Sequence, residues 1–265
     1  MVVTTAEIRR KLDQGGQRWT VPLLTRPAEL EAQAVPLDQY LVGAFLGDGG
    51  ITSSTMYLTT ADAEVLANIR AALPEGVELV PSGGRYGYRV RAPERWYNPI
   101  RWHFAQLGIL GLRSWEKHIP ESYLWNGADV RLAMLQGLLD TDGWVVAHSS
   151  SVGYATTSER LADGVEFLVR SLGGVVTRRT VVTSYTYRGE KRKGRLSWRL
   201  TLNLPASIAP FRLSRKLAHV RPKVKWRQPR RYIVGYEAVG EEAGVCFHID
   251  HPSSLYVAND FIVTH

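Results

Sequence analysis

Cysteine is almost missing from this sequence of 265 residues, since Cys246 is the only one. A single cysteine cannot form an internal disulfide, and it excludes a metal site built from several cysteines. Long apolar runs are missing too: no stretch approaches the roughly 18 uninterrupted apolar residues of a membrane span, and the N-terminal segment lacks a signal-peptide core. These absences predict a soluble, cytoplasmic protein with no membrane partner.

Hydrophobic residues make up 45% of the chain, enough for a proper core, and the net charge of +8 is unevenly distributed. Residues 188–231 hold 15 Lys and Arg against one acid, Glu190, whereas residues 232–265 hold five acids and no Lys or Arg. A basic block of this kind is either a solvated face or a phosphate-binding surface. The change of sign near residue 231 predicts a domain boundary.

Two segments repeat the same pattern, LVGAFLGDGG at 41–50 and LQGLLDTDGW at 135–144. Each is followed by a short strand, a Thr-Thr pair, a helix with three-to-four apolar spacing and a β-hairpin pattern. We align Thr59-Thr60 with Thr156-Thr157. The interval of roughly 95 residues is too long for a solenoid repeat and predicts two pseudo-symmetric lobes, at 36–130 and 131–228.

Small residues four apart, Gly43 with Gly47 and Gly137 with Thr141, lie on one face of each motif helix. Such faces allow two helices to pack closely. Asp48 and Asp142 then meet at the negative C-terminal ends of both helices, where a cation must compensate them. A lone Asp-Gly is typical of a hairpin turn, and a calcium loop needs more ligands. The repetition favours a site for Mg²⁺ or another divalent metal.

The two segments resemble the paired motifs of LAGLIDADG homing endonucleases in their single-chain form, over roughly residues 36–225. The resemblance implies an α+β fold with two lobes of mixed sheet and helices forming a DNA-binding saddle. It also implies a monomer with internal pseudo-twofold symmetry that makes metal-dependent double-strand breaks. Asp48 and Asp142 match the final acidic position of each motif, which implies the metal-binding catalytic pair.

Residues 115–120, WEKHIP, resemble the Lys-x-Ile-Pro block of intein-borne members, which implies a catalytic role for Lys117; without the family it reads as a surface lysine. Lys223 and Lys225 are the candidates for a second such lysine. Asp140, which has no acidic counterpart in the first copy, is interpreted as a residue that caps or hydrogen-bonds locally and not as a metal ligand.

Double-stranded DNA is the partner that the resemblance implies. Basic residues of the two hairpins and of the segment after them are the candidate contacts with phosphates and base edges. They are Arg85, Arg89, Arg91, Arg178, Arg179, Arg188, Lys191, Arg192, Lys193, Arg195, Arg199, Lys223 and Lys225. A maturase or regulator on the same scaffold, which binds nucleic acid without cleaving it, is the alternative.

The last residues, 244–265, resemble the all-β C-terminal splicing segment of inteins. His265 matches the penultimate histidine that assists asparagine cyclisation. Cys246 matches an internal nucleophile, although a lone cysteine in a strand is by default a small buried hydrophobe. Splicing by residues 229–265 would need an N-terminal intein segment as partner, and a decayed nuclease remains an alternative. Residues 1–35 are expected to form a short helix, capped by Thr4 or Thr5, and an extended linker.

Overall fold

The computed structural model describes residues 3–15, 19–52, 54–94, 96–147, 149–221, 228–241, 243 and 249–264. The chain divides into two compact units. One runs from residue 26 to 226, and the other joins residues 1–25 with 227–265. Within the described ranges, no helix combines the length and apolar character that a membrane crossing requires.

The first lobe of the larger unit is built on a four-stranded sheet in the order β2-β3-β5-β4. Its elements are α2 (Gln39–Asp48), β2 (Gly49–Gly50), β3 (Tyr57–Thr59), α3 (Ala63–Ala71), β4 (Glu78–Pro81), β5 (Gly87–Arg91), α4 (Pro99–Gln106) and α5 (Glu121–Leu124). A turn containing Gly83 and Gly84, both at positive φ, joins β4 to β5. This is the short hairpin that the sequence predicts.

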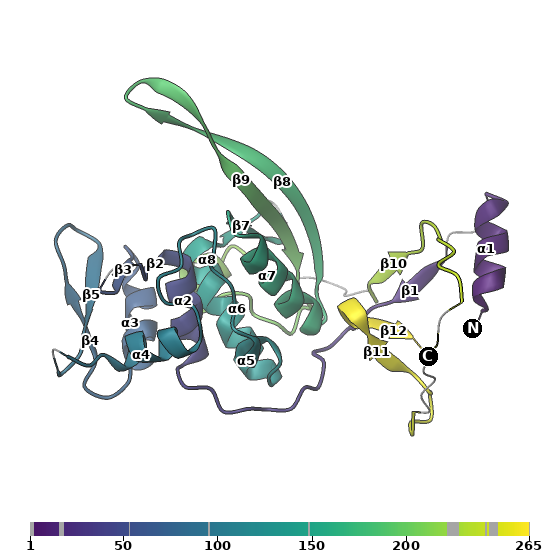
Figure 1. Cartoon of the computed structure of the whole chain (residues 1–265), viewed down its shortest axis with the longest axis horizontal. Coiled ribbons are helices and arrows are strands. Elements are labelled where there is room, and N and C mark those ends of the chain that lie inside the picture. The colour runs from purple at the N-terminus through teal and green to yellow at the C-terminus, as the bar shows by residue number, and fades with distance from the viewer. Residues whose placement is uncertain are drawn as a thin grey trace. The chain divides into compact units, whose positions relative to one another are not determined.

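The second lobe repeats this arrangement, with a sheet in the order β6-β7-β9-β8. Its elements are α6 (Ala128–Asp142), β6 (Trp144–Val145), β7 (Val152–Thr156), α7 (Glu159–Ser171), β8 (Val175–Tyr187), β9 (Glu190–Asn203) and α8 (Ser214–Leu217). The equivalent strand order confirms the predicted duplication. Figure 1 shows the long β8–β9 hairpin extending beyond the rest of its lobe.

The expectation of mixed sheets is wrong, because every strand pair in both sheets is antiparallel. The helix α3 carries the chain from β3 to β4, so these two strands run in the same direction. They are not neighbours, however, because β5 lies between them and pairs antiparallel with both. The second lobe places β9 between β7 and β8 in the same way.

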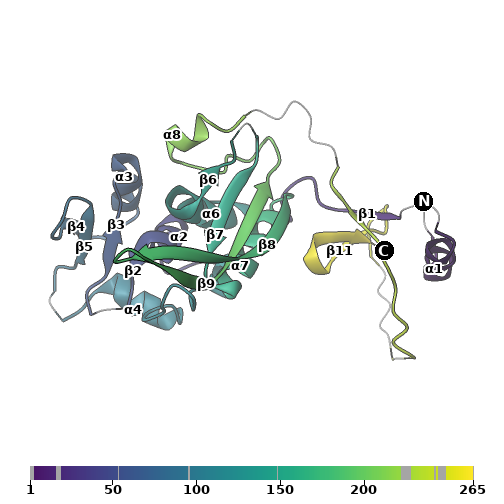
Figure 2. The same cartoon turned by 90° about the horizontal axis from the view of Figure 1, so that it is seen from above.

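The two motif helices pack against each other through glycine, as the sequence predicts (Figure 2). A methyl group at Gly43 would lie 2.4 Å from the carbonyl oxygen of Met134, and one at Gly137 would lie 2.3 Å from that of Tyr40. Both distances are too short for any side chain, so the backbones touch directly. The helices end at Asp48 and Asp142, with Gly49 and Gly143 as their C-caps.

A buried arginine ties the chain entering this unit to the second lobe. Arg131 has no solvent exposure. Its guanidinium donates hydrogen bonds to the carbonyl oxygens of Ala28, Asn126 and Ser171, and the 2.9 Å bond to Ser171 reaches the end of α7. Asn126 in turn exchanges hydrogen bonds with the backbone of Gln33. The segment before α2 is therefore fixed to the lobe by polar contacts.

The smaller unit brings the two ends of the chain together. Its elements are α1 (Thr5–Asp13), β1 (Thr20–Pro22), β10 (Arg230–Tyr232), β11 (Tyr256–Ala258) and β12 (Ile262–Thr264). The predicted cap of α1 is confirmed, because the Thr4 hydroxyl accepts a hydrogen bond from the backbone N–H of Glu7. Strand β1 pairs with β10, and Leu23 forms a β-bridge with Ile262. The sequence analysis, which expected a linker after α1, did not predict these pairings.

Candidate active site

Two aspartates lie at the end of the helix seam, each as the last residue of its helix. Asp142 faces the other helix, because a methyl group built at Gly47 would lie 3.2 Å from its Oδ2 atom. Asp48 and Asp142 both keep solvent-accessible surface. Within the described residues, neither carboxylate accepts a hydrogen bond, so their oxygens are open to an incoming group.

The two carboxyl groups repel each other. Burial, which removes water from the carboxylate, is the largest cause that raises the pKa of Asp142 from 3.8 to about 6, and the charge of Asp48 raises it further. Burial likewise raises the pKa of Asp48. The charges of Lys117 and Lys216 act in the opposite direction on both groups. A cation between the carboxylates would relieve the remaining repulsion.

Lys117 closes the end of α2. Its Nζ atom donates hydrogen bonds to the carbonyl oxygens of Phe45 (3.3 Å), Gly47 (3.1 Å) and Gly49 (3.0 Å). These carbonyls carry the partial negative charge of a helix C-terminus, where an ammonium group is stabilising. The residue is only 6% exposed, and burial lowers its pKa to about 8. The lysine singled out by the sequence thus lies beside the two aspartates.

Lys216 makes the equivalent contacts at the end of α6. Its Nζ atom donates to the carbonyl oxygens of Leu139 (2.9 Å), Asp140 (2.6 Å) and Gly143 (2.7 Å). Lys216 is not among the candidates for a second lysine that the sequence offers, and those candidates, Lys223 and Lys225, lie outside the described residues. A signal was present in the spacing, because Lys117 follows Asp48 by 69 residues and Lys216 follows Asp142 by 74.

Asp140 belongs to the core. Its Oδ2 atom accepts a 2.9 Å hydrogen bond from the Tyr40 hydroxyl, and both carboxylate oxygens accept from the backbone N–H of Leu213 at 3.2 Å. Asp140 does accept hydrogen bonds, but the expectation that they are local is wrong, because its partners lie 73 and 100 positions away along the chain. The first lobe has Leu46 at this position and needs no such contacts.

The residues at the seam fit a divalent metal that is shared with a phosphate. The described residues contain no group of three or more His, Cys, Asp or Glu side chains able to hold a metal alone. Mg²⁺ accepts one or two carboxylates together with waters and phosphate oxygens. Among the described residues the buried Tyr154 hydroxyl has no hydrogen-bond partner, and burial together with the charges of Asp142 and Asp48 raises its pKa.

An exposed aromatic side chain accompanies each aspartate. Trp144 is 42% exposed and pairs with Gly153, whose missing side chain makes room for the indole ring. In the second lobe the aromatic residue is on β6 and the glycine on β7. In the first lobe the order is reversed, because the glycine, Gly50, is on β2 and pairs with Tyr57 on β3, which is 39% exposed. The sequence analysis did not single out either aromatic residue.

Arginines cover the sheet faces turned away from the helices. Arg179 and Arg199 face each other across β8 and β9, both exposed. Directly opposed like charges destabilise a sheet, so this pair suits a surface that meets an anion. Arg89 is exposed on β5 in the first lobe, while exposed Arg91 forms a 2.5 Å ion pair with Glu78. Arg85 lies in the β4–β5 turn over the ring of Tyr86.

Arg178 does not belong to this surface. It pairs with Leu200, a core residue, and therefore lies on the helix-covered face of the sheet. Its guanidinium contacts Glu159, Asp163 and Glu166 of α7. Arg178 is a candidate DNA contact by sequence, but its side chain takes the covered face, because side chains alternate between faces along a strand and its neighbour Arg179 takes the open face.

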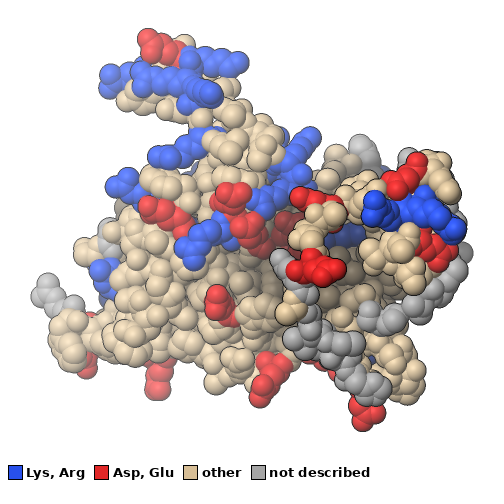
Figure 3. All heavy atoms as spheres, turned by 45° about the vertical axis from the view of Figure 1, so that its right-hand side comes forward, with Lys and Arg blue, Asp and Glu red and all other residues tan. Residues whose placement is uncertain are grey.

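The tip of the β8–β9 hairpin is strongly basic. Figure 3 shows Lys and Arg covering the projecting end of the molecule. The exposed residues there are Arg188, Lys191, Arg192 and Lys193, with Arg195 on the strand that leads back. The guanidinium of Arg192 lies 4.9 Å from the centre of the Tyr187 ring, and that of Arg195 lies 3.7 Å from the ring of Trp115. The hairpin thus carries positive charge away from the body of its lobe.

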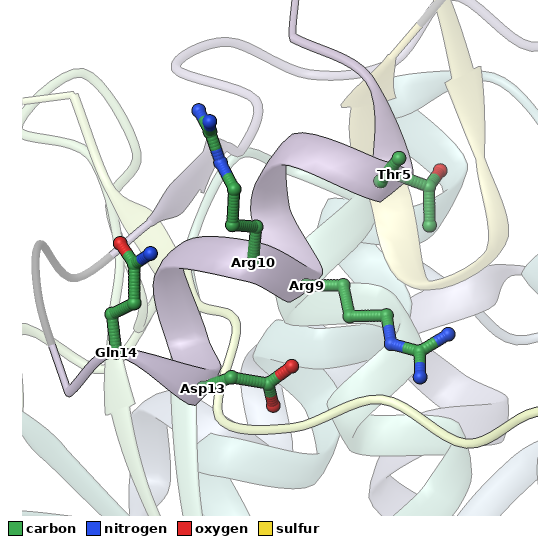
Figure 4. Close-up of a pocket in the computed structure, with 6 residues that line it drawn as sticks. Thr5, Arg9, Arg10, Asp13 and Gln14 are labelled. Carbon is green, nitrogen blue, oxygen red and sulfur yellow. The ribbon is translucent and has the colours of Figure 1, made fainter.

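The described part of the smaller unit offers no comparable site. A hollow of about 510 Å³ is lined only by residues of α1 and its C-cap. The side chains of Arg9 and Arg10 point in different directions there (Figure 4). Cys246 and His265, the residues expected to act in splicing, lie outside the described residues.

Residues 129–211 match the family described as LAGLIDADG-like domain. Over longer stretches the chain is similar to replicative DNA helicase DnaB of Mycobacterium intracellulare (31% identical over 241 residues, 90% of this chain and 36% of that protein). It is also similar to DnaB of Rhodothermus marinus (28% identical, 69% and 20%) and to RecA of Mycobacterium bovis (31% identical, 54% and 19%). The chain spans about a third or less of these relatives.

Two similar solved structures concern the homing endonuclease I-DmoI. One is its complex with DNA and calcium, with a TM-score of 0.43, 15% identity and coverage of 68% of this chain and 94% of that chain. The other is a set of mesophilic variants, with a TM-score of 0.40, 15% identity and coverage of 63% and 88%.

Proposed function

We propose that this protein is a site-specific DNA endonuclease that makes metal-dependent double-strand breaks by phosphodiester hydrolysis. The observation that carries the proposal is the seam itself. Two helices end side by side on Asp48 and Asp142, and Lys117 and Lys216 each place an ammonium group on the carbonyls of one helix end. Duplicated acids and duplicated cations suit a reaction performed twice, once on each strand.

Asp48 and Asp142 would hold Mg²⁺ or another divalent metal, which when bound supplies an activated water and neutralises charge on the leaving oxygen. Lys117 and Lys216 would lie close to the negative charge that develops on a phosphate held by this metal, and their fixed ammonium groups would stabilise that charge without rearranging. Burial of Lys117 lowers its pKa to about 8, so it keeps its proton at neutral pH. The protein thus orients both carboxylates and both cations before DNA arrives.

The open faces of the two sheets would bind the duplex. Arg89, Arg179 and Arg199 point away from the helices, and the basic hairpin tip extends the same kind of surface. Contacts of arginine with phosphates set the position on DNA, and contacts with guanine edges set the sequence. Trp144 and Tyr57, beside the aspartates, supply flat apolar surface for the nucleotides next to the scissile bonds.

The test is cleavage of a plasmid that carries the host coding sequence without the segment that encodes this chain. We expect wild type with Mg²⁺ to linearise it, and Asp48→Asn and Asp142→Asn to lose about two orders of magnitude in rate or more while still binding. Asp129→Asn, at the opposite end of α6, is the matched control and should cleave normally. Tight binding with both strands intact in every divalent metal would instead show a non-cleaving DNA-binding protein.

We further propose that the chain is part of an intein in a replicative helicase, and that residues 229–265 take part in protein splicing when an N-terminal intein segment is supplied. The pairing of both chain ends in one unit supports this, as does the similarity to the DnaB protein of Mycobacterium intracellulare over 90% of the chain. With asparagine added after His265 and that segment supplied, flanking sequences should become ligated. Cys246→Ala should abolish ligation, and splicing indifferent to Cys246 would remove it from the mechanism.

A further inference from the structure

Lys117 contacts both lobes: its side chain binds the end of α2 in the first lobe, and its backbone is held by the second lobe. Its ammonium group contacts the end of α2 in the first lobe. Its backbone carbonyl accepts a 2.6 Å hydrogen bond from the hydroxyl of Ser158, which is the N-cap residue of α7 in the second lobe. The same hydroxyl accepts a hydrogen bond from the N–H of Leu161. The start of α7 therefore sets the position of Lys117.

Lys216 shows the reciprocal arrangement. Its ammonium group contacts the end of α6 in the second lobe. The residue before it, Arg215, donates hydrogen bonds of 2.8 and 2.6 Å to the two carboxylate oxygens of Asp62, the N-cap residue of α3 in the first lobe. Ser214 donates to Glu64, in the first turn of α3, from its N–H at 3.0 Å and its hydroxyl at 2.7 Å.

Asp62 and Ser158 occupy equivalent positions in the two lobes. The backbone N–H of Asp62 donates to the Thr60 hydroxyl at 3.2 Å, and that of Ser158 donates to the Thr156 hydroxyl at 3.1 Å. The same turn thus precedes α3 and α7. The structure aligns Thr60 with Thr156, which corrects the sequence alignment of the Thr-Thr pairs by one residue. The anchor of each lysine therefore comes from one repeated position.

We infer that Asp62 and Glu64 are positioning residues for Lys216, and that Ser158 is the positioning residue for Lys117. The inference rests on the proposed function, because it concerns the lysines of that site. Each lysine is set by the opposite lobe, so the two halves of the site are complete only when both lobes are correctly docked. Removing one anchor releases one lysine, and the two DNA strands are then cut at unequal rates.

The two anchors differ in chemistry, and this provides an independent test. The contacts of Lys216 run through an ion pair on the surface, in which Arg215 is 60% exposed. Exposed charge pairs weaken as salt rises, because the screening length falls to about 3 Å at 1 M. The anchor of Lys117 is a neutral hydrogen bond from a buried serine. High salt should therefore release Lys216 and leave Lys117 in place.

The first experiment measures acetylation of individual lysines by acetic anhydride, followed by mass spectrometry, and needs no cleavage. Asp62→Ala with Glu64→Ala should speed modification of Lys216 about tenfold and leave Lys117 unchanged. The double variant should fold, because the Asp62 side chain makes no capping hydrogen bond in α3. Ser158→Ala should release Lys117 instead, and Ser158→Thr, which keeps the hydroxyl, should restore it. Glu78→Gln, which removes an ion pair elsewhere, is the control.

The second experiment follows each strand of a labelled target separately. The Asp62 and Glu64 double variant should shift the ratio of the two strand rates about tenfold and accumulate nicked DNA, with unchanged DNA affinity. Unchanged acetylation of Lys216, or an equal gain at both lysines, would overturn the inference. Faster acetylation of Lys216 combined with an unchanged ratio of the two strand cleavage rates would also overturn it. If the wild-type protein cuts neither strand, the proposed nuclease activity is refuted. The acetylation assay does not depend on that activity and still tests the positions of the two lysines.

Discussion

At the scale of the residue, the site consists of two helix ends. Each has an aspartate as its last residue and a lysine whose ammonium group binds its last carbonyls. Asp48 and Asp142 end their helices where the dipole disfavours negative charge. Lys117 and Lys216 are bound to the last carbonyls of the same helices and offset that field. Their ammonium groups donate to backbone oxygens, and the carboxylates accept no hydrogen bond from the described residues, which leaves them available for other ligands.

The raised pKa of Asp142 predicts how stability depends on pH in the absence of metal. Its pKa is about 6 in the folded protein, whereas the ordinary value of an aspartate, which we assign to the unfolded chain, is 3.8. The folded state therefore keeps this proton up to a higher pH. The resulting stabilisation is fully present below about pH 4 and is lost as pH rises through about 6. In EDTA, Asp142→Asn should remove part of the fall in unfolding free energy between pH 4 and pH 7, on the order of 1 kcal/mol after solvent screening.

Urea titrations at several pH values measure this effect. Asp129→Asn, an exposed position in the first turn of the same helix, should leave the wild-type profile unchanged. If Asp142→Asn and wild type lose stability in parallel across that range, the assigned environment of Asp142 is incorrect.

At the scale of the element, the helix seam depends on the absence of side chains. Gly43→Ala would place a methyl group 2.4 Å from the Met134 carbonyl and 3.2 Å from the Cα atom of Gly137. These are backbone atoms of the facing helix, so relief requires the helices to separate. We expect a loss of about 1 to 3 kcal/mol in unfolding free energy, measured by urea denaturation.

Gly50→Ala is the matched control for that variant. A methyl group there would meet Tyr57 Cβ at 3.6 Å, which is ordinary contact, and Gly50 is not among the glycines with positive φ. Equal destabilisation by the two substitutions would show that the seam does not require close approach.

Adjacent arginines on opposite faces of β8 test which surface binds DNA. Arg179→Gln should weaken DNA binding and reduce the slope of log affinity against log salt by about 1, because it removes one phosphate contact. Arg178→Gln should leave both quantities unchanged, since its guanidinium contacts three carboxylates of α7 on the covered face. Fluorescence anisotropy at several salt concentrations measures this. Equal effects of both variants would place the DNA elsewhere.

The whole molecule consists of two units with separate cores. The larger contains both lobes, both aspartates and both lysines, whereas the smaller needs both chain ends because β1 pairs with β10. We expect a fragment of residues 26–226 to unfold cooperatively and to keep the DNA affinity of the full chain. Circular dichroism and anisotropy provide the measurements. Loss of cooperative unfolding in the fragment would show that the chain ends are required for the larger unit.

Much of the larger unit was predictable because local patterns determine it. Repeated small residues identified the helix faces that pack, and the positions of Asp48 and Asp142 identified where α2 and α6 end. Lys216 was missed because its contacts join residues more than 70 positions apart, and nothing local marks that lysine. The direction of Arg178 was missed because strand register decides which face a residue takes.

The sequence by itself determined the duplication, the glycine seam and the two aspartates at its end, because helix periodicity and small-residue spacing act over a few neighbouring positions. Only the tertiary structure decided which lysine closes each helix, which arginines face outward and which residues anchor the lysines across the lobes. Those choices depend on hydrogen bonds and ion pairs between segments distant along the chain, and such pairs form only after both lobes have packed.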